Sequence, residues 1–262
     1  MKNIGLILFD IDGVIRSVEN SYRLSLKKTV YKFSGWEPSY FDIDNAKNEG
    51  IWNNDWDLSL ELIKRRIKKE DLNLTLPSRE KIIKCFEEFY FGGNPDKNSK
   101  SWTGFIKNEE LLVDKKFFDL LESNGIIWGF VSGAECASAK FVLEKRLGLK
   151  SPPLISMGDA PDKPDPKGFI NLSKKLIGDK LGESNIPIAY VGDTIADINT
   201  VINARKEISS QKFISIGIAP PHLHLNSRLK ERNSYETKLR DAGADLILNS
   251  IYELKDINLA LF

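Results

Sequence analysis

Four stretches of this sequence carry side chains that could bind a cation and attack an electrophile, and three of them directly follow an apolar run. They contain Asp10 and Asp12 (FDIDGV), Ser132 and Gly133 (FVSGA), Lys163 (DKPDPKG), and Asp193 and Asp197 (VGDTIAD). Carboxylates held close together repel one another unless a cation lies among them. Oxygen ligands around an open site suit Mg²⁺ better than a transition metal. The residue types therefore predict a Mg²⁺ site.

The same residues suit the transfer of a phosphoryl group. A carboxylate can attack phosphorus and form an aspartyl-phosphate intermediate. Mg²⁺ and a lysine neutralise charge on the transferring group, and a hydroxyl with backbone N–H groups after a strand can hold its oxygens. A second carboxylate two residues away can protonate the leaving oxygen and then activate water. Asp10 and Asp12 have that spacing.

The elements that must position these residues are short apolar strands. Continuous apolar runs without alternation are typical of parallel strands buried on both faces. We predict strands at Ile4–Phe9, Ile126–Val131, Ile186–Val191, Phe213–Ile218 and Ala244–Leu248. In an open α/β sheet, ligands bind at the carboxyl ends of the strands near the switch in strand order. Three of the polar stretches fall at such ends.

Helical patterns alternate with the strands and lie at Glu109–Ser123, Ala134–Leu147, Gly168–Ile177 and Thr194–Arg205. Strand–helix alternation of this kind predicts a three-layer α/β core, with a doubly wound, Rossmann-like parallel sheet.

One segment has no strong strand pattern and reads as amphipathic helices at Tyr22–Phe33, Asp57–Lys68 and Ser78–Phe91. We therefore expect an all-helical cap domain of residues 18–102, inserted into a catalytic core of residues 1–17 and 103–262.

These motifs resemble those of the haloacid dehalogenase (HAD) superfamily, in its phosphatase branch with a helical cap. The family's motifs are matched in order by Asp10-Ile11-Asp12-Gly13-Val14, by Ser132, by Lys163 in KPDP, and by residues 192–197, which fit G-D-x-x-x-D. Singly each motif is weak, because Asp-Gly favours turns and an aspartate can cap a helix. Four in order over nearly the whole chain are specific.

The resemblance implies roles for the carboxylates. Asp10 would be the nucleophile and Asp12 the general acid/base. Asp10, the backbone carbonyl of Asp12 and Asp193 would hold Mg²⁺. Dehalogenases of the family lack the second acid, so the presence of Asp12 favours phosphoryl chemistry.

The resemblance also implies which residues bind the phosphoryl group, namely Ser132, Gly133 and Lys163. Asp197 would lie outside the direct metal ligands and orient Lys163.

Composition bounds the protein class. The chain has 262 residues, of which 41% are hydrophobic and 29% charged, and its formal net charge is +1. Such values exclude a disordered or collagen-like protein and give no basic field for nucleic acid or an acidic membrane. Cys85 and Cys136 lack zinc or C-x-x-C spacing, and no apolar run reaches about 18 residues. We expect a cytoplasmic protein without membrane or nucleic-acid partners, and its oligomeric state stays open.

Substrate contacts are harder to predict. Asn53, Asn54 and Asp55 form a polar turn between two tryptophans, in WNNDW, of the kind that can meet substrate hydroxyls. Arg16, beside the first hinge, could meet a second anionic group. The alternatives are that the aromatic residues of this segment only build a small helical core, and that Arg16 forms a surface salt bridge.

We therefore expect Mg²⁺-dependent hydrolysis of a small phosphorylated metabolite through an aspartyl phosphate. Two alternatives remain: a phosphomutase, which passes the phosphoryl group to a phosphorylated sugar, and a non-catalytic binding protein of the same fold.

Overall fold

The computed structural model describes residues 4–47, 49, 51–52, 54–178, 181–183 and 186–255. The chain divides into two compact units, Met1–Ser17 with Glu110–Phe262, and Val18–Glu109.

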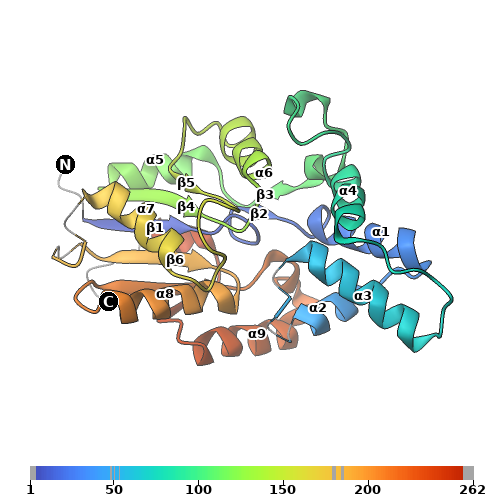
Figure 1. The fold of residues 1–262 in the computed structure, drawn as a ribbon. Coiled ribbons are helices and arrows are strands. Elements are labelled where there is room, and N and C mark those ends of the chain that lie inside the picture. The colour runs from blue at the N-terminus through green and yellow to red at the C-terminus, as the bar shows by residue number, and fades with distance from the viewer. Residues whose placement is uncertain are drawn as a thin grey trace. The chain divides into compact units, whose positions relative to one another are not determined.

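The first unit is built on a six-stranded sheet in the order β5-β4-β1-β6-β7-β8 (Figure 1). Its strands, all parallel, are β1 (Gly5–Phe9), β4 (Ile126–Val131), β5 (Leu154–Ile155), β6 (Ile188–Gly192), β7 (Phe213–Ile218) and β8 (Leu246–Leu248). Every residue of β1, β6 and β7 is buried, as their continuous apolar sequences predict. The chain runs from β1 outward to β4 and β5 and then returns past β1 to β6, so the strand order reverses at β1.

Helices cover both faces of this sheet (Figure 1). One face carries α7 (Lys167–Ile177), α8 (Ile195–Glu207) and α9 (Leu229–Asp241). The other carries α5 (Lys115–Ser123) and α6 (Cys136–Lys140), which continues as a π-helical segment, Phe141–Arg146. The ring of Phe9 on β1 lies 5.9 Å from that of Phe118 on α5, which shows how closely the layers pack. The predicted doubly wound α/β fold is confirmed.

Local details differ from the predicted elements. The helix expected from Glu109 begins at Lys115, after Asp114 accepts a hydrogen bond from the N–H of Phe117 at 3.0 Å. Ahead of it, β3 (Glu110–Leu111) pairs antiparallel with β2 (Arg16–Ser17). Neither β5 nor α9 was among the predicted elements. The strand is only two residues long, and the helix sequence, LKERNSYETKLRD, carries too few apolar residues to show a periodicity.

The second unit contains the helices α1 (Tyr22–Ser34), α2 (Tyr40–Lys47), α3 (Asp55–Lys69) and α4 (Arg79–Tyr90). Its described regular elements are helical, as predicted. Leu26 and Val30 of α1, Leu58 of α3 and Phe86 of α4 are completely buried. The apolar faces read from the sequence therefore form a small helical core.

Residues after Trp102 extend this helical unit. Ile106 is buried in a 3₁₀ turn, Phe105–Asn108. The buried carboxylate of Glu109 accepts hydrogen bonds from Ser21 at 2.8 Å and from Tyr90 at 2.9 Å. The unit thus ends at Glu109, beyond the expected boundary at residue 102. None of the helices in the described parts of the chain has the length and apolar character needed to cross a membrane.

Candidate active site

The polar residues singled out in the sequence follow neighbouring strands of the sheet. Asp10 follows β1, Ser132 follows β4 and Asp193 follows β6. The backbone N–H of Asp10 donates to the carbonyl of Val191 at 2.9 Å, which ties the carboxyl ends of β1 and β6 together. Because β1 is where the strand order reverses, these side chains lie at the switch point where open α/β sheets bind ligands.

Lys163 joins this cluster from the loop before α7. Its Nζ lies 2.5 Å from Oδ1 of Asp197 and 3.1 Å from Oδ1 of Asp10. The ammonium group is largely buried, and Asp197 is completely buried. The ammonium group of Lys163 is thus shared between Asp10, which follows β1, and Asp197, in the first turn of α8.

Tyr190 of β6 contributes a third group beside Lys163. Its hydroxyl donates to the carbonyl oxygen of Val131 at 2.6 Å and accepts from Nζ of Lys163 at 3.3 Å. The same oxygen lies 3.2 Å from Oδ1 of Asp197. Since Val131 directly precedes Ser132, this tyrosine links the end of β4 to the Lys163–Asp197 pair.

The other oxygen of Asp197 is occupied by a helix cap. The Thr194 hydroxyl caps α8 by accepting from the N–H of Asp197, while Oδ2 of Asp197 accepts from the N–H and hydroxyl of Thr194. This reciprocal capping box fixes the Asp197 side chain. Both of its oxygens therefore have partners in the chain, which suits a residue that orients Lys163 more than one that binds a metal directly.

Asp193 packs closely on the turn that follows Asp10. A Cβ placed on Gly13 would lie 2.0 Å from Oδ2 of Asp193, and Gly13 has a φ of +80°. Glycine is therefore required there both for conformation and for space. The backbone carbonyl of Asp193 accepts from the Tyr235 hydroxyl at 2.7 Å, so α9 also holds this turn.

The crowded carboxylates have shifted pKa values. Burial raises the pKa of Asp10 to about 6, with Asp197 and Asp12 adding to the rise and Lys163 opposing it. Burial also raises the pKa of Asp193 well above its usual range, and the charges of Asp197 and Asp10 add to this. The pKa of Lys163 stays well above its ordinary value because Asp10 and Asp197 outweigh the effect of burial.

These observations fit a divalent cation. One carboxylate oxygen from each of Asp10, Asp193 and Asp197 lies within 4.8 Å of the others. Oδ1 of Asp10 is buried without a hydrogen bond, although it is within ion-pair distance of Lys163. Burial and neighbouring carboxylates raise the pKa of both Asp10 and Asp193, an effect that a bound cation would oppose. An all-oxygen set of this kind suits Mg²⁺.

Asp12 is held differently from the other carboxylates. Its Oδ1 accepts a hydrogen bond from Nε of Arg16 at 2.6 Å. The sequence left open whether Arg16 meets an anionic group of the substrate or forms a salt bridge; in the structure its side chain forms this ion pair and has no exposed surface. Asp12 is thus one partner of this buried arginine.

Ser132 and Gly133 form the turn after β4. The Ser132 N–H donates to the carbonyl of Ile155 at 2.9 Å, and the Ser132 hydroxyl accepts from the N–H of Ala134 at 3.2 Å. Gly133 is exposed, and a Cβ there would meet nothing within 4 Å. The space beside this turn is therefore open to a ligand.

The polar turn of the helical unit has local partners. The Asn54 side chain caps α3 by accepting from the N–H groups of Trp56 and Asp57. Asp55 forms an ion pair with Lys47 at 2.6 Å. Asn53 lies outside the described residues. Substrate contact by these three residues stays a prediction.

Tyr190, Tyr235 and the Arg16–Asp12 pair were not found from the sequence. A tyrosine in an otherwise apolar buried strand is a usable signal, because its hydroxyl needs a partner. The spacing Thr194-x-x-Asp197 likewise matches a capping box. No sequence signal indicates Tyr235, because its partner is a backbone carbonyl far away in the chain.

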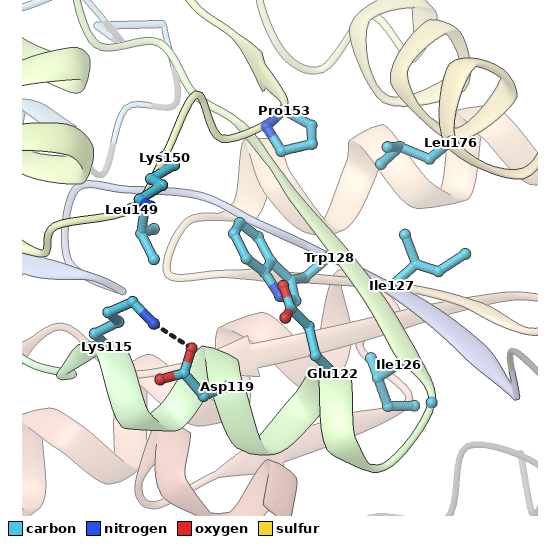
Figure 2. Close-up of a pocket in the computed structure, with 11 residues that line it drawn as sticks. Lys115, Asp119, Glu122, Ile126, Ile127, Trp128, Leu149, Lys150, Pro153 and Leu176 are labelled. Atoms are coloured by element: carbon cyan, nitrogen blue, oxygen red, sulfur yellow. Dashed lines mark hydrogen bonds and ion pairs between the residues drawn. The ribbon is translucent and has the colours of Figure 1, made fainter. Parts of the chain in front are cut away.

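Figure 2 shows a hollow elsewhere in the same unit, around the amino-terminal half of β4. Ile127 and Trp128 contribute apolar surface, and Lys115 pairs with Asp119 beside them. Ser132 follows the opposite end of the same strand. This hollow is therefore separate from the carboxylate cluster.

Comparison with known proteins gives one curated relative and several solved structures. The sequence matches no family model. Imidazoleglycerol-phosphate dehydratase of Phytophthora nicotianae is 30% identical over 96% of this chain and 52% of that protein. The chain therefore spans about half the length of the curated relative it matches.

The similar structures agree on the fold. A phosphonoacetaldehyde hydrolase-like protein from Oleispira antarctica aligns with a TM-score of 0.65 at 16% identity, over 97% of this chain and 90% of that one. Phosphatase Tt82 from Thermococcus thioreducens gives 0.61 at 21% identity, over 90% and 99%. A HAD hydrolase of family IA, variant 3, from Entamoeba histolytica gives 0.58 at 14% identity, over the full length of both chains.

The sheet order and the acidic cluster at its switch point define a doubly wound α/β protein with a charged centre at the carboxyl ends of its strands. Its fold is that of the HAD-superfamily hydrolases, as the four sequence motifs predicted.

Proposed function

We propose that this protein is a Mg²⁺-dependent phosphatase that hydrolyses a small phosphate monoester through an aspartyl phosphate on Asp10. The observation that carries the proposal is the state of the Asp10 carboxylate. It is buried at the end of β1, its Oδ1 has no hydrogen bond, and Lys163 lies 3.1 Å away. A carboxylate so placed is available to attack phosphorus beside a cation that neutralises the transferring group.

The reaction has two steps. Asp10 attacks phosphorus while the bond to the leaving oxygen breaks and Asp12 gives that oxygen a proton. Asp12 then accepts a proton from water as the water attacks the aspartyl phosphate, which releases phosphate and restores Asp10. Mg²⁺ held by Asp10, Asp193 and the Asp12 carbonyl would neutralise charge on the phosphoryl oxygens.

The phosphoryl group would be held at the turn after β4 and by Lys163. Ser132 offers a hydroxyl, Gly133 a backbone N–H beside open space, and Lys163 a positive charge. Asp197 and Tyr190 keep the lysine aimed at Asp10. Such preorganised donors are worth most where the transition state carries negative charge.

The test is a panel of phosphorylated metabolites assayed for phosphate release with Mg²⁺. The name of the Phytophthora relative supports adding alkyl phosphates that carry an imidazole ring, since this chain matches half of a protein named for such a compound. We expect release that is lost in Asp10→Asn and in excess chelator. Isomerised product without free phosphate would indicate the mutase alternative, and binding without turnover the non-catalytic one.

A further inference from the structure

The loop between Asp10 and β2 folds back on itself, so that Arg16 returns to the side of Asp12. The N–H of Gly13 donates to the carbonyl of Arg16 at 2.8 Å, and the N–H of Arg16 donates to the carbonyl of Ile11 at 3.1 Å. The backbone of Arg16 is therefore bonded to the residues immediately before and after Asp12. This geometry brings two side chains four positions apart together without a helix.

The position of Arg16 is also fixed from outside the loop. Arg16 pairs with Leu111 in the β2–β3 ladder, and the N–H of Leu112 donates to the carbonyl of Ile15 at 2.9 Å. The arginine thus approaches Asp12 from a backbone anchored on both sides.

The burial of the pair is asymmetric. The Arg16 side chain has 0% exposed surface, whereas that of Asp12 is 29% exposed. A buried arginine is rare unless it is paired, because removing its charge from water is costly. The guanidinium therefore holds one oxygen of the carboxylate from the protein interior, while part of the Asp12 side chain stays exposed.

The role proposed for Asp12 requires its carboxylate to be held in a defined position. A general acid must lie within hydrogen-bond reach of the oxygen that leaves. An aspartate side chain that is 29% exposed would otherwise be free to exchange between rotamers, whereas the charge-assisted hydrogen bond from Nε of Arg16 to its Oδ1 holds this carboxylate on one side.

We propose that Arg16 is a positioning residue that aims the Asp12 carboxylate at the leaving oxygen. This inference rests on the proposed phosphatase function. Arg16 acts through Asp12, so its contribution follows the demand for proton transfer: large when the leaving group is a basic alkoxide and small when it is a stable phenolate.

The test compares Arg16→Gln and Arg16→Lys with the unchanged protein on glycerol 2-phosphate and p-nitrophenyl phosphate. We expect Arg16→Gln to lower kcat/KM for glycerol 2-phosphate at least about tenfold more than for p-nitrophenyl phosphate, within the range of general acid catalysis. The ratio of the two kcat/KM values in Arg16→Lys should lie between those of Arg16→Gln and the unchanged protein, because lysine keeps the positive charge but not the planar group that donates from Nε. A purely structural role would lower kcat/KM equally for both substrates, and that result would overturn the inference.

A matched control and a double variant complete the design. Arg205 pairs with Asp245 and donates to the carbonyl of Phe213, at the amino end of β7 and so away from the site. Arg205→Gln should leave the substrate ratio unchanged. In an Asp12→Asn background, Arg16→Gln should change the ratio by less than about twofold, because the group it positions is gone. Additive effects would refute the role.

The same assays separate the two proposals. Turnover by the unchanged protein that disappears in Asp10→Asn supports the phosphatase function whatever Arg16 does. A selective fall in kcat/KM for glycerol 2-phosphate in the Arg16 variants but not in Arg205→Gln, with melting temperatures close to the parent, supports the positioning role. Absence of turnover in the unchanged protein would overturn both.

Discussion

Lys163 and Asp197 form the most buried ion pair of the site, with 2.5 Å between Nζ and Oδ1. The second oxygen of Asp197 is committed to the cap of α8. The lysine is therefore directed by a carboxylate that cannot turn away, while its charge remains 3.1 Å from Oδ1 of Asp10. Several expected outcomes depend on this relationship.

Removing the lysine should remove most of the activity. Lys163→Ala is expected to lower kcat/KM by at least about a hundredfold, the scale for losing one charge partner in the transition state. Lys167→Ala is a suitable control, because its exposed side chain pairs only loosely with Asp165, at 3.8 Å. The measurement is kcat/KM for phosphate release by the two variants. A loss below threefold in Lys163→Ala would show that Lys163 does not bind the transferring phosphoryl group.

Tyr190→Phe should remove a hydrogen bond to Lys163 while keeping the buried ring, so that no large cavity forms. The change deletes the hydroxyl that bonds Val131 and Lys163, and it leaves a buried carbonyl without this donor. We expect a stability loss of about 1–2 kcal/mol and a fall in kcat/KM of roughly three- to thirtyfold, about 0.7–2 kcal/mol of transition-state stabilisation. Urea unfolding and steady-state kinetics measure the two effects. Tyr252→Phe, remote from the cluster, should change neither, and an unchanged kcat/KM in Tyr190→Phe would assign the hydroxyl to stability alone.

Mg²⁺ should stabilise the protein more at pH 7.5 than at pH 5.5. The pKa of Asp10 in the folded, metal-free chain is raised to about 6 from 3.8, so the folded state holds more protons than the unfolded state between these values. The free energy of unfolding therefore falls as the pH rises through this window, and the raised pKa of Asp193 acts in the same direction. Mg²⁺ relieves the repulsion only when the carboxylates are ionised.

The measurement for this prediction is the difference in melting temperature between Mg²⁺ and chelator at the two pH values. Asp193→Asn should reduce the difference at pH 7.5. A shift that is as large at pH 5.5 as at pH 7.5 would argue against Asp10 and Asp193 as the ligands.

Substitutions of Asp10 and Asp12 should impair different steps of the reaction. Asp10→Asn should abolish turnover, because no covalent intermediate forms. Asp12→Asn should still be phosphorylated by p-nitrophenyl phosphate, whose leaving group needs little protonation, but should hydrolyse the intermediate slowly. Rapid-mixing kinetics should show a nitrophenol burst near one equivalent per enzyme. Residual activity in Asp10→Asn, with no burst in Asp12→Asn, would favour direct attack by water.

Asp55 tests the role of the helical unit in substrate recognition. Asp55→Ala is expected to lower kcat/KM more for the natural phosphate ester than for p-nitrophenyl phosphate, which lacks distant hydroxyl groups. Lys47→Met breaks the same ion pair from the other side and serves as the control. Equal losses on both substrates, or equal effects of the two substitutions, would assign Asp55 to folding.

The sequence alone determined the strands that end at the chemical residues and the four stretches that follow them. These are local properties: β4 and β7 coincide with their predicted ranges because a strand buried on both faces is a continuous apolar run. Asp10, Ser132 and Asp193 could be placed at one edge because parallel strands share their carboxyl ends. The fold class followed from the alternation of strands and helices.

Only the tertiary structure decided which partners those residues have. Tyr190 meets Val131 and Lys163 because β6 and the loop before α7 come together across the sheet. Arg16 reaches Asp12 because Gly13 adopts a left-handed turn and β3 returns to pair with β2. Such contacts depend on the register and close approach of segments distant in sequence. Local patterns do not encode these distances, because they result from the packing of the whole core.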